Sequence, residues 1–312
     1  MELAMNEGNS QKDIVVGCLC ALGCEVIFGL SYLFTKQATG AASELALLGW
    51  RFIVAFLVMN ACVLSGLIKI HLKNKSLKKI VLVAVCNPLI YFTGETVGIN
   101  YTTASESGVF LASIPIASLV CSTFVLHKKP APRETAGIGL TLLGVFITVL
   151  VVGMEASFSP AGYAMLSMAV ISYALYSVFV EKASEFSGIE ITYMMLSIGA
   201  LFFGTLAVGE ALIHNSFNTL LWLPLTSIPF LAAVLYQGIF CSILAFFLFN
   251  KAIVSIGVNR SSSFIGIATV ISIIAGVMIL EEEFTIAQMA GVILIIAGVY
   301  IANAKTVESR CG

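Results

Sequence analysis

The stretch GCEVIFGLSYLFTK, residues 23–36, decides the fold class of this chain because it places one glutamate inside a long apolar run. From Ile14 to Thr35 the only charged residue is Glu25. A helix of that length, rising about 1.5 Å per residue, crosses the roughly 30 Å hydrocarbon core of a bilayer. We therefore interpret the run as a membrane span with Glu25 near its middle.

The composition of the whole chain supports a membrane protein. Of its 312 residues 59% are hydrophobic and only 11% are charged, against about 25% charged in ordinary soluble domains. The net charge of −1 gives no reason to expect a nucleic-acid partner. The first segment lacks an early basic region and a small-residue cleavage site, so we interpret the first span as retained.

Apolar windows along the chain predict ten transmembrane helices, which makes the fold class an all-α membrane protein. The predicted helices cover residues 14–36, 45–67, 80–100, 105–126, 134–153, 160–181, 190–213, 226–250, 257–280 and 285–303. Residues 1–13 and 304–312 are left as tails.

Lysine and arginine predict the orientation of these helices. If both termini lie on one side of the membrane, that side receives all of the 16 basic residues except Lys36 and Arg51. The positive-inside rule then places both termini in the cytoplasm. We expect a multi-pass protein of the cytoplasmic (inner) membrane.

An internal repeat explains why ten helices are predicted. A shift of 154 residues places AGIGLTLLGVFI (136–147) on AGVILIIAGVYI (290–301), with six of twelve positions identical. Near the start of each half, a shift of 145 places FGLSYLF (28–34) on YALYSVF (173–179). The two predicted repeats, 14–153 and 160–303, hold five helices each. Because five is odd, the two repeats have opposite orientations in the membrane.

The repeated segments carry paired glycines. Gly137 and Gly144, like Gly291 and Gly298, are seven residues apart and share one helix face. Small residues on one face let two helix backbones approach closely in a membrane. We therefore expect these four glycines to serve helix packing.

Several motifs resemble the EamA module of the drug/metabolite transporter superfamily. They are FGLSYLFTK (28–36), INYTTASESGVFLASIPIA (99–117) and AGIGLTLLGV, with weaker copies YALYSVFVEK and SIGVNRSSSFIGIATVIS in the second half. The resemblance covers nearly the whole chain and implies an exporter-type carrier of ten helices with a central cavity lined by both halves. The chain departs from the family pattern at Phe28, where tryptophan is frequent, and at Thr269, which stands opposite Pro115. The family carries amino acids, sugars, drugs and other metabolites, so the resemblance names no substrate.

Glu25 heads a small and polar stripe on the first predicted helix. Gly29, Tyr32 and Lys36 follow at i+4, i+7 and i+11 and share its face. The aligned position of the second half is Val170, so only one half carries the carboxylate. A carboxylate in hydrocarbon costs several kcal/mol, so an unpaired Glu25 would tend to take up a proton. Proton coupling and a structural role, in capping or pairing between helices, both stay open.

Arg51 and Glu95 are further ionisable residues inside predicted spans. An arginine at that depth needs a carboxylate partner or an anionic ligand, so a salt bridge to Glu25 or Glu95 and a contact with substrate both stay open. Glu95 has Tyr91 one turn away and is the second candidate for proton coupling. The remaining candidates for the cavity wall are Tyr173, Tyr176 and Gln237, which can supply aromatic surface and hydrogen bonds.

Motifs of known enzyme classes do not occur in the sequence. The three histidines, His71, His127 and His214, fall at loops or helix ends, and there is no HExxH, GxSxG or Walker motif. The eight cysteines include no CxxC pair, so we expect neither a disulfide framework nor a metal site, and no cofactor. A membrane-embedded enzyme and a receptor that transports nothing are the alternatives.

We therefore interpret the chain as a secondary carrier of small organic metabolites, expected to work as an exporter. Its expected partners are a small-molecule substrate and the lipid bilayer, and it would act as a monomer or homodimer. The two halves would rock around the central cavity, with Glu25 or Glu95 taking up and releasing a proton.

The inverted repeat predicts the sidedness of three loops. Tags at the Asn74 and Pro130 loops should be accessible from the cytoplasm, and a tag at the Glu282 loop from outside, because an odd number of spans separates the first two from the third. Protease protection of tagged protein in right-side-out and inside-out vesicles measures this. Asn74 and Glu282 on the same side would contradict the inverted repeat.

Overall fold

The computed structural model describes residues 2–38, 42–73, 75–102, 104–151, 159–279 and 285–304. These residues form helices and connecting loops, and they include no strand. In chain order the helices are α1 (Glu2–Ala38), α2 (Glu44–Leu64), α3 (Leu77–Ala84), η1 (Val85–Ile90), α4 (Tyr91–Tyr101), α5 (Ala104–Ala112), α6 (Ile114–Val125), α7 (Pro132–Val151), α8 (Pro160–Lys182), α9 (Gly188–Ile213), α10 (Phe217–Thr226), α11 (Ile228–Leu235), η2 (Tyr236–Ala245), α12 (Phe246–Ile256), α13 (Val258–Ser263), α14 (Gly266–Ile279) and α15 (Ile286–Asn303). The predicted all-α class is confirmed.

Nine segments of the described chain are long and apolar enough to cross a membrane. They correspond to nine of the ten predicted spans. The tenth, predicted at 134–153, corresponds to α7, which begins with the polar residues Arg133 and Glu134 and packs along α15. The multi-pass membrane fold is confirmed, and the exact number of ten spans stays a prediction.

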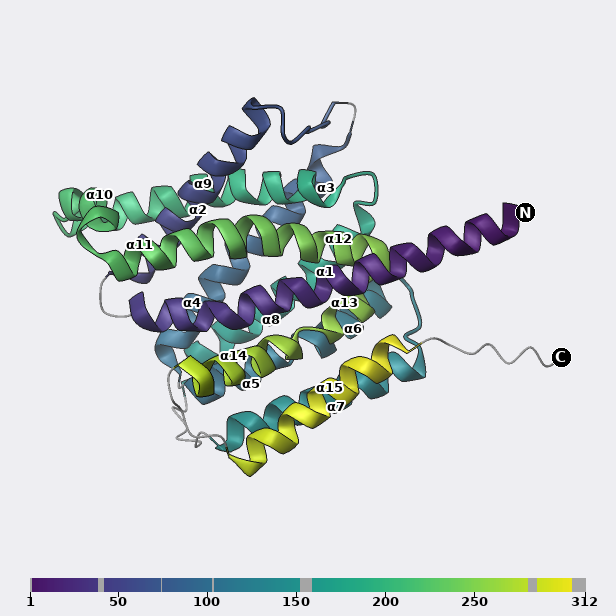
Figure 1. Ribbon diagram of the computed structural model, residues 1–312. Coiled ribbons are helices and arrows are strands. Elements are labelled where there is room, and N and C mark those ends of the chain that lie inside the picture. The colour runs from purple at the N-terminus through teal and green to yellow at the C-terminus, as the bar shows by residue number, and fades with distance from the viewer. Residues whose placement is uncertain are drawn as a thin grey trace.

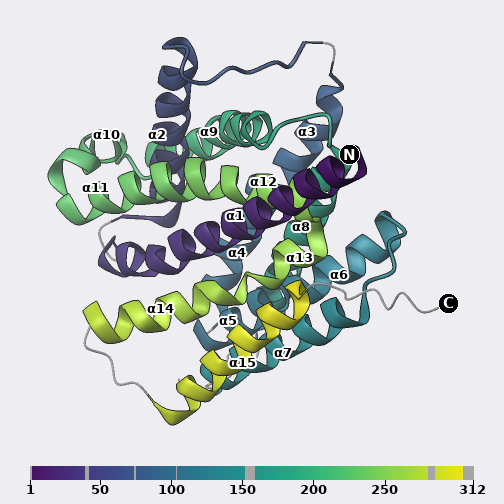
Figure 2. The same ribbon diagram turned by 45° about the vertical axis from the view of Figure 1, so that its right-hand side comes forward.

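Helices of one half of the chain pack mainly against helices of the other half, and the pattern is the same when the two halves are interchanged. Helix α1 packs against α12 and α14, as α8 of the second half packs against α4 and α6 of the first. The equivalent helices α2 and α9 pack on each other, and so do α7 and α15. The α2–α9 pair and the α7–α15 pair lie at opposite edges of the molecule, with α1 and α8 between them (Figures 1 and 2). This exchange is the arrangement expected of halves related by a two-fold axis.

The third helix of each half is interrupted, where the sequence predicted continuous helices at 80–100 and 226–250. In the first half, η1 separates α3 from α4, and Asn87 has the extended angles φ −141° and ψ 115°. Pro88 lacks a backbone N–H and cannot continue an α-helical ladder through this point. In the second half, η2 separates α11 from α12 with i→i+5 turns. Such π-helical segments frequently occur at functional sites.

Other helix boundaries also differ from the predicted ones. Helix α1 begins at Glu2, so the polar segment predicted as a tail continues the first helix. The span predicted at 226–250 begins at Ile228, after Ser227 has capped α11 by accepting a hydrogen bond from the Phe230 N–H. Helix α10 precedes it as a separate element and lies at the end of the molecule away from the start of α1 (Figure 1). Serine at the N-cap followed by proline in the first turn explains this new start.

The predicted packing role of the paired glycines is confirmed. A Cβ atom added at Gly144 would lie 2.6 Å from the Gly291 carbonyl oxygen, and one added at Gly137 would lie 2.5 Å from the Gly298 carbonyl oxygen. Helices α7 and α15 therefore touch backbone to backbone at two levels. Side chains larger than hydrogen at these positions would hold the helices apart.

Valine at Gly144 should lower the free energy of unfolding by about 1–3 kcal/mol, because its side chain would overlap backbone atoms of α15. Gly139 lies on the same helix, and a Cβ atom there meets no atom within 4 Å, so Gly139→Val is the matched control. Thermal unfolding of both purified variants in detergent measures the difference. Equal losses in the two variants would contradict the packing role of Gly144.

Candidate functional site

Glu25 is buried on α1 at the contact between the two halves. Glu25 is 3% exposed to solvent. One turn further on, the Gly29 carbonyl oxygen accepts a 2.9 Å hydrogen bond from Ser272 of α14. No basic side chain of the described chain lies within 4 Å of the Glu25 carboxylate, so the structural alternative of an ion pair is not what the structure shows. The side chains of Tyr32 and Lys36, which were predicted on the same stripe, lie outside the described part of the chain.

Glu95 contacts Tyr91, which lies one turn earlier on α4. The Tyr91 hydroxyl donates a 2.7 Å hydrogen bond to Glu95 Oε1. Helix α4 begins at Tyr91, directly after the break at η1, so the break determines where this pair lies. The Tyr91 ring also packs edge-on against Tyr173 of α8, with ring centroids 5.2 Å apart. An acid and two phenol rings from both halves therefore meet here.

Tyr176 belongs to a neighbouring buried network and not to the wall of an open cavity. It is 1% exposed, and its hydroxyl donates a 2.6 Å hydrogen bond to Asn250 Oδ1 on α12. The Asn250 amide donates in turn to Thr192 Oγ1 on α9 at 3.0 Å. Tyr176 therefore links α8 to α12 and α9. Its ring still supports Tyr173, because the two centroids lie 5.3 Å apart.

Arg51 is buried on α2 and points toward η2 of the second half. Its Nε donates a 2.7 Å hydrogen bond to Ser242 Oγ, and its Nη1 approaches Gln237 Oε1 at 3.5 Å. The guanidinium carbon lies 4.6 Å from the centroid of the Phe92 ring. Neither Glu25 nor Glu95 forms an ion pair with Arg51, so the predicted alternative of a salt bridge is not the arrangement found.

These side chains form one group, which we call the central cluster: Glu25, Arg51, Tyr91, Glu95, Tyr173 and Gln237. Tyr91 contacts both Glu95 and Tyr173, Arg51 approaches Gln237, and α1, which carries Glu25, packs against η2, which carries Gln237. Helices α1, α2 and α4 of the first half and α8 and η2 of the second supply the members. The cluster therefore spans the contact between the halves.

Sequence reasoning missed Ser242 and the phenylalanines around Arg51. Ser242 follows Gln237 by five residues, and its hydroxyl donates a 2.9 Å hydrogen bond to the Gln237 carbonyl oxygen. On an α-helix residues five apart do not share a face, whereas the i→i+5 turns of η2 bring them together. The apolar sequence around Tyr236 contains no signal that announces this change of period.

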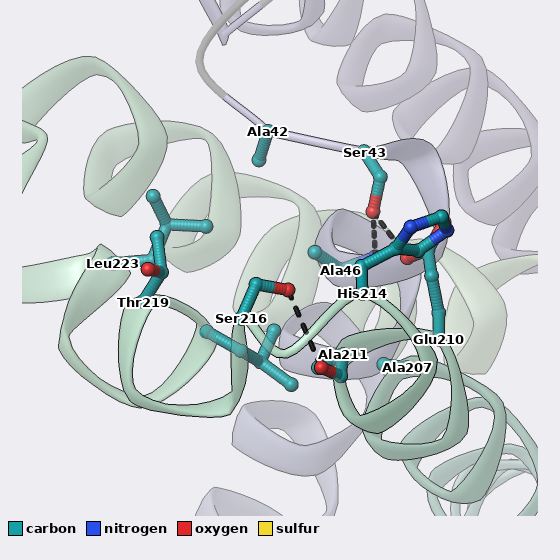
Figure 3. Close-up of a pocket in the computed structure, with 11 residues that line it drawn as sticks. Ala42, Ser43, Ala46, Ala207, Glu210, Ala211, His214, Ser216, Thr219 and Leu223 are labelled. Carbon is teal, nitrogen blue, oxygen red and sulfur yellow. Dashed lines mark hydrogen bonds between the residues drawn. The ribbon is translucent and has the colours of Figure 1, made fainter.

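A separate pocket of about 360 Å³ lies at the end of the molecule where α2 begins and α9 ends. Figure 3 shows Ser43, Glu210 and His214 around it, with Ala207 and Leu223 among the apolar lining residues. Ser43 Oγ donates a 2.5 Å hydrogen bond to Glu210 Oε2. No member of the central cluster lines this pocket, so the two polar regions are distinct.

Comparison with known proteins places the chain among membrane transporters. The model of the EamA-like transporter family matches residues 15–150 and 160–304. The uncharacterized transporter YcxC of Bacillus subtilis (strain 168) is 29% identical over 289 residues, covering 91% of this chain and 92% of its own. The uncharacterized transporter YetK of the same organism is 27% identical over 273 residues, covering 82% of this chain and 77% of its own.

A solved crystal structure shares the same fold. It aligns with a TM-score of 0.73 at 18% sequence identity, covering 92% of this chain and 98% of that one.

Proposed function

Because the chain belongs to the EamA-like transporter family, we propose that it is a secondary carrier that exports small organic metabolites, such as amino acids or related compounds, by alternating access. The observation that carries this proposal is the central cluster, in which charged side chains are buried inside membrane-spanning helices at the contact between the halves. Intramembrane ionisable groups are costly and are typical of substrate and proton pathways. The substrate would bind at this contact, and rocking of the halves would expose it to each side in turn.

Glu25 is our candidate for the proton-coupling group. Its carboxyl group is buried, and no basic side chain among the described residues lies within 4 Å of it, so its ionised form is poorly stabilised while the cluster is closed. When rocking of the halves brings water to it, the ionised form gains hydration. Proton binding and release would then follow the conformational cycle. Glu95 is the second candidate, and the hydrogen bond that it accepts from Tyr91 stabilises its ionised form.

Ion pairs between the halves support the rocking motion. Each ion pair between described residues joins the first half to the second, and all of them lie at the end where α1 begins and α15 ends (Figure 1). The pairs are Lys75–Glu190, Lys79–Glu185, Lys128–Glu181 and Arg260–Glu134. The hydrogen bond from Lys79 lowers the pKa of Glu185 below its ordinary value. In this conformation the halves are therefore tied together at one end, while the pocket near Glu210 lies at the other.

We assign the tied end to the cytoplasmic side of the cytoplasmic membrane. The basic segments 69–73, 75–79 and 128–133 and the start of α1 lie at this end, and the positive-inside rule orients them inward. The protein would then be closed toward the cytoplasm in this structure. We propose that one chain, alone or in a homodimer, forms a complete carrier, because both halves of the central cluster come from the same chain.

Glutamine at Glu25 should abolish proton coupling without unfolding the protein, because it preserves size and hydrogen bonding but cannot titrate. A metabolite-panel efflux assay in cells with and without the protein first identifies the substrate. In proteoliposomes Glu25→Gln should lose flux driven by a pH gradient, retain substrate exchange and melt at the wild-type temperature. Glu95→Gln is measured beside it. Undiminished pH-driven flux in Glu25→Gln would exclude this role and leave Glu95 as the candidate.

Glutamine at Lys75 should loosen the tied end, because Lys75 Nζ lies 2.7 Å from Glu190 Oε2 across the two halves. We expect faster labelling of buried Cys86 by an impermeant maleimide in inside-out vesicles, read by peptide mass spectrometry. Lys75→Arg keeps the charge and should label like wild type, as should Lys69→Gln in the same loop. Wild-type labelling of Cys86 in Lys75→Gln would show that this pair does not hold the halves together.

A further inference from the structure

We propose that Arg51, Gln237 and Ser242 form the subsite that binds an anionic group of the transported substrate, in the first place a carboxylate. This inference rests on the proposed function, because it names the substrate class of the same central cluster. It begins from the charge of Arg51, which forms no ion pair with any side chain that the structure describes. Arg51 is 6% exposed and stays protonated at all physiological pH values.

The neighbours of Arg51 solvate its charge without neutralising it. Ser242 and Gln237 offer neutral oxygens, and the rings of Phe92, Phe52 and Phe246 lie within 4.6, 5.5 and 6.0 Å of the guanidinium carbon. Aromatic faces attract a cation but carry no net charge. A buried arginine in such surroundings gains most from an anion placed directly against it.

The free side of the guanidinium has the geometry that a carboxylate requires. Nε is engaged by Ser242, and Nη2 has no hydrogen-bond partner in the described part of the chain. The contact from Nη1 to Gln237 is 3.5 Å long and therefore weak. Adjacent N–H groups on Nη1 and Nη2 thus remain for the two parallel hydrogen bonds that arginine makes to carboxylates.

The two carboxylates of the central cluster do not pair with Arg51. Glu95 accepts its hydrogen bond from Tyr91, and neither Glu95 nor Glu25 comes within 4 Å of the guanidinium nitrogens. Arg51 follows Glu44 by seven residues on α2, which places it about 10 Å below the start of the helix. A lipid headgroup does not reach this depth against a residue so little exposed, so the anion must enter between the halves.

The position of the subsite connects binding to rocking. Arg51 belongs to the first half, whereas Gln237 and Ser242 belong to η2 of the second. The Ser242 hydroxyl donates to the Gln237 carbonyl, so its oxygen is free to accept from Arg51 Nε and hold the guanidinium plane. An anion bound to Arg51 beside Gln237 and Ser242 would lie between the halves, so its binding would depend on how the halves are placed.

The substitution Gln237→Glu tests the subsite, because it places an internal carboxylate of equal size beside Arg51. We expect a higher melting temperature and a loss of about tenfold or more in flux and affinity for anionic substrates. Gln288→Glu is the matched control. Gln288 occupies the capping box of α15, where glutamate serves equally well, and the change in net charge is the same. A structural arginine predicts the same gain in stability for Gln237→Glu but unchanged flux.

A binding measurement separates this inference from the transport proposal. Thermal unfolding in detergent is followed with sodium acetate and benzoate against acetamide and benzamide at equal ionic strength. The acids should stabilise the wild type and Gln288→Glu more than their amides do, and this difference should vanish in Gln237→Glu.

Two results would overturn the anion subsite, and a third would separate the subsite from the transport proposal. Acids that stabilise the wild type no more than their amides would overturn the anion subsite, and so would wild-type flux of an identified substrate in Gln237→Glu. If the wild type transports no compound of the metabolite panel but the acid-specific stabilisation is present, the subsite stands and the transport proposal fails.

Discussion

Hydrocarbon offers no hydrogen-bond partners, and the whole structure follows from that constraint. Every backbone group within the membrane must be satisfied inside its own helix, so the described chain consists of helices and short connections. The same constraint acts on side chains. The hydroxyls of Ser177, Thr192 and Ser262 bond to carbonyl oxygens three or four residues earlier in their own helices or close by. The charged groups of Arg51 and Glu25 do not bond to carbonyl oxygens of their own helices in this way, and both are buried. This exception is why we propose the contact between the halves as the functional site.

The interrupted helices show how the fold positions polar groups within the membrane. In the first half, the break at η1 ends one helix and starts α4 with Tyr91, so that Tyr91 and Glu95 face α8. In the second half, η2 turns Gln237 and Ser242 toward Arg51. The breaks lie in equivalent helices of the two halves, yet they carry different side chains. Two equivalent helices therefore carry different polar side chains at their breaks, and the proposed site is asymmetric within a symmetric scaffold.

Two kinds of contact join the halves in different parts of the molecule: close glycine packing and ion pairs between long side chains. Helices α7 and α15 meet through glycines at two levels and leave no room for sliding side chains between them. Where the start of α3 and the loop before it meet the start of α9 and the loop before that helix, long lysine and glutamate side chains join the halves instead. Ion pairs that border water are individually weak and can break one at a time. In the rocking mechanism that we propose, α7 and α15 would stay together while the tied end opens.

The sequence by itself determined the membrane fold, the duplication and the packing glycines, because each is written in local properties: long apolar runs, a repeated string and glycines seven residues apart. It also determined that Glu25 and Arg51 must be buried and that Tyr91 and Glu95 share a helix face. Only the tertiary structure decided what faces Arg51, because Ser242 and Gln237 are about 190 residues away on the chain and their common face depends on i→i+5 turns. It likewise decided that Tyr176 binds Asn250 and that Glu25 and Glu95 leave Arg51 without an ion pair. Partners of this kind depend on how two halves dock, and docking is set by the sum of many apolar contacts that no single stretch of sequence contains.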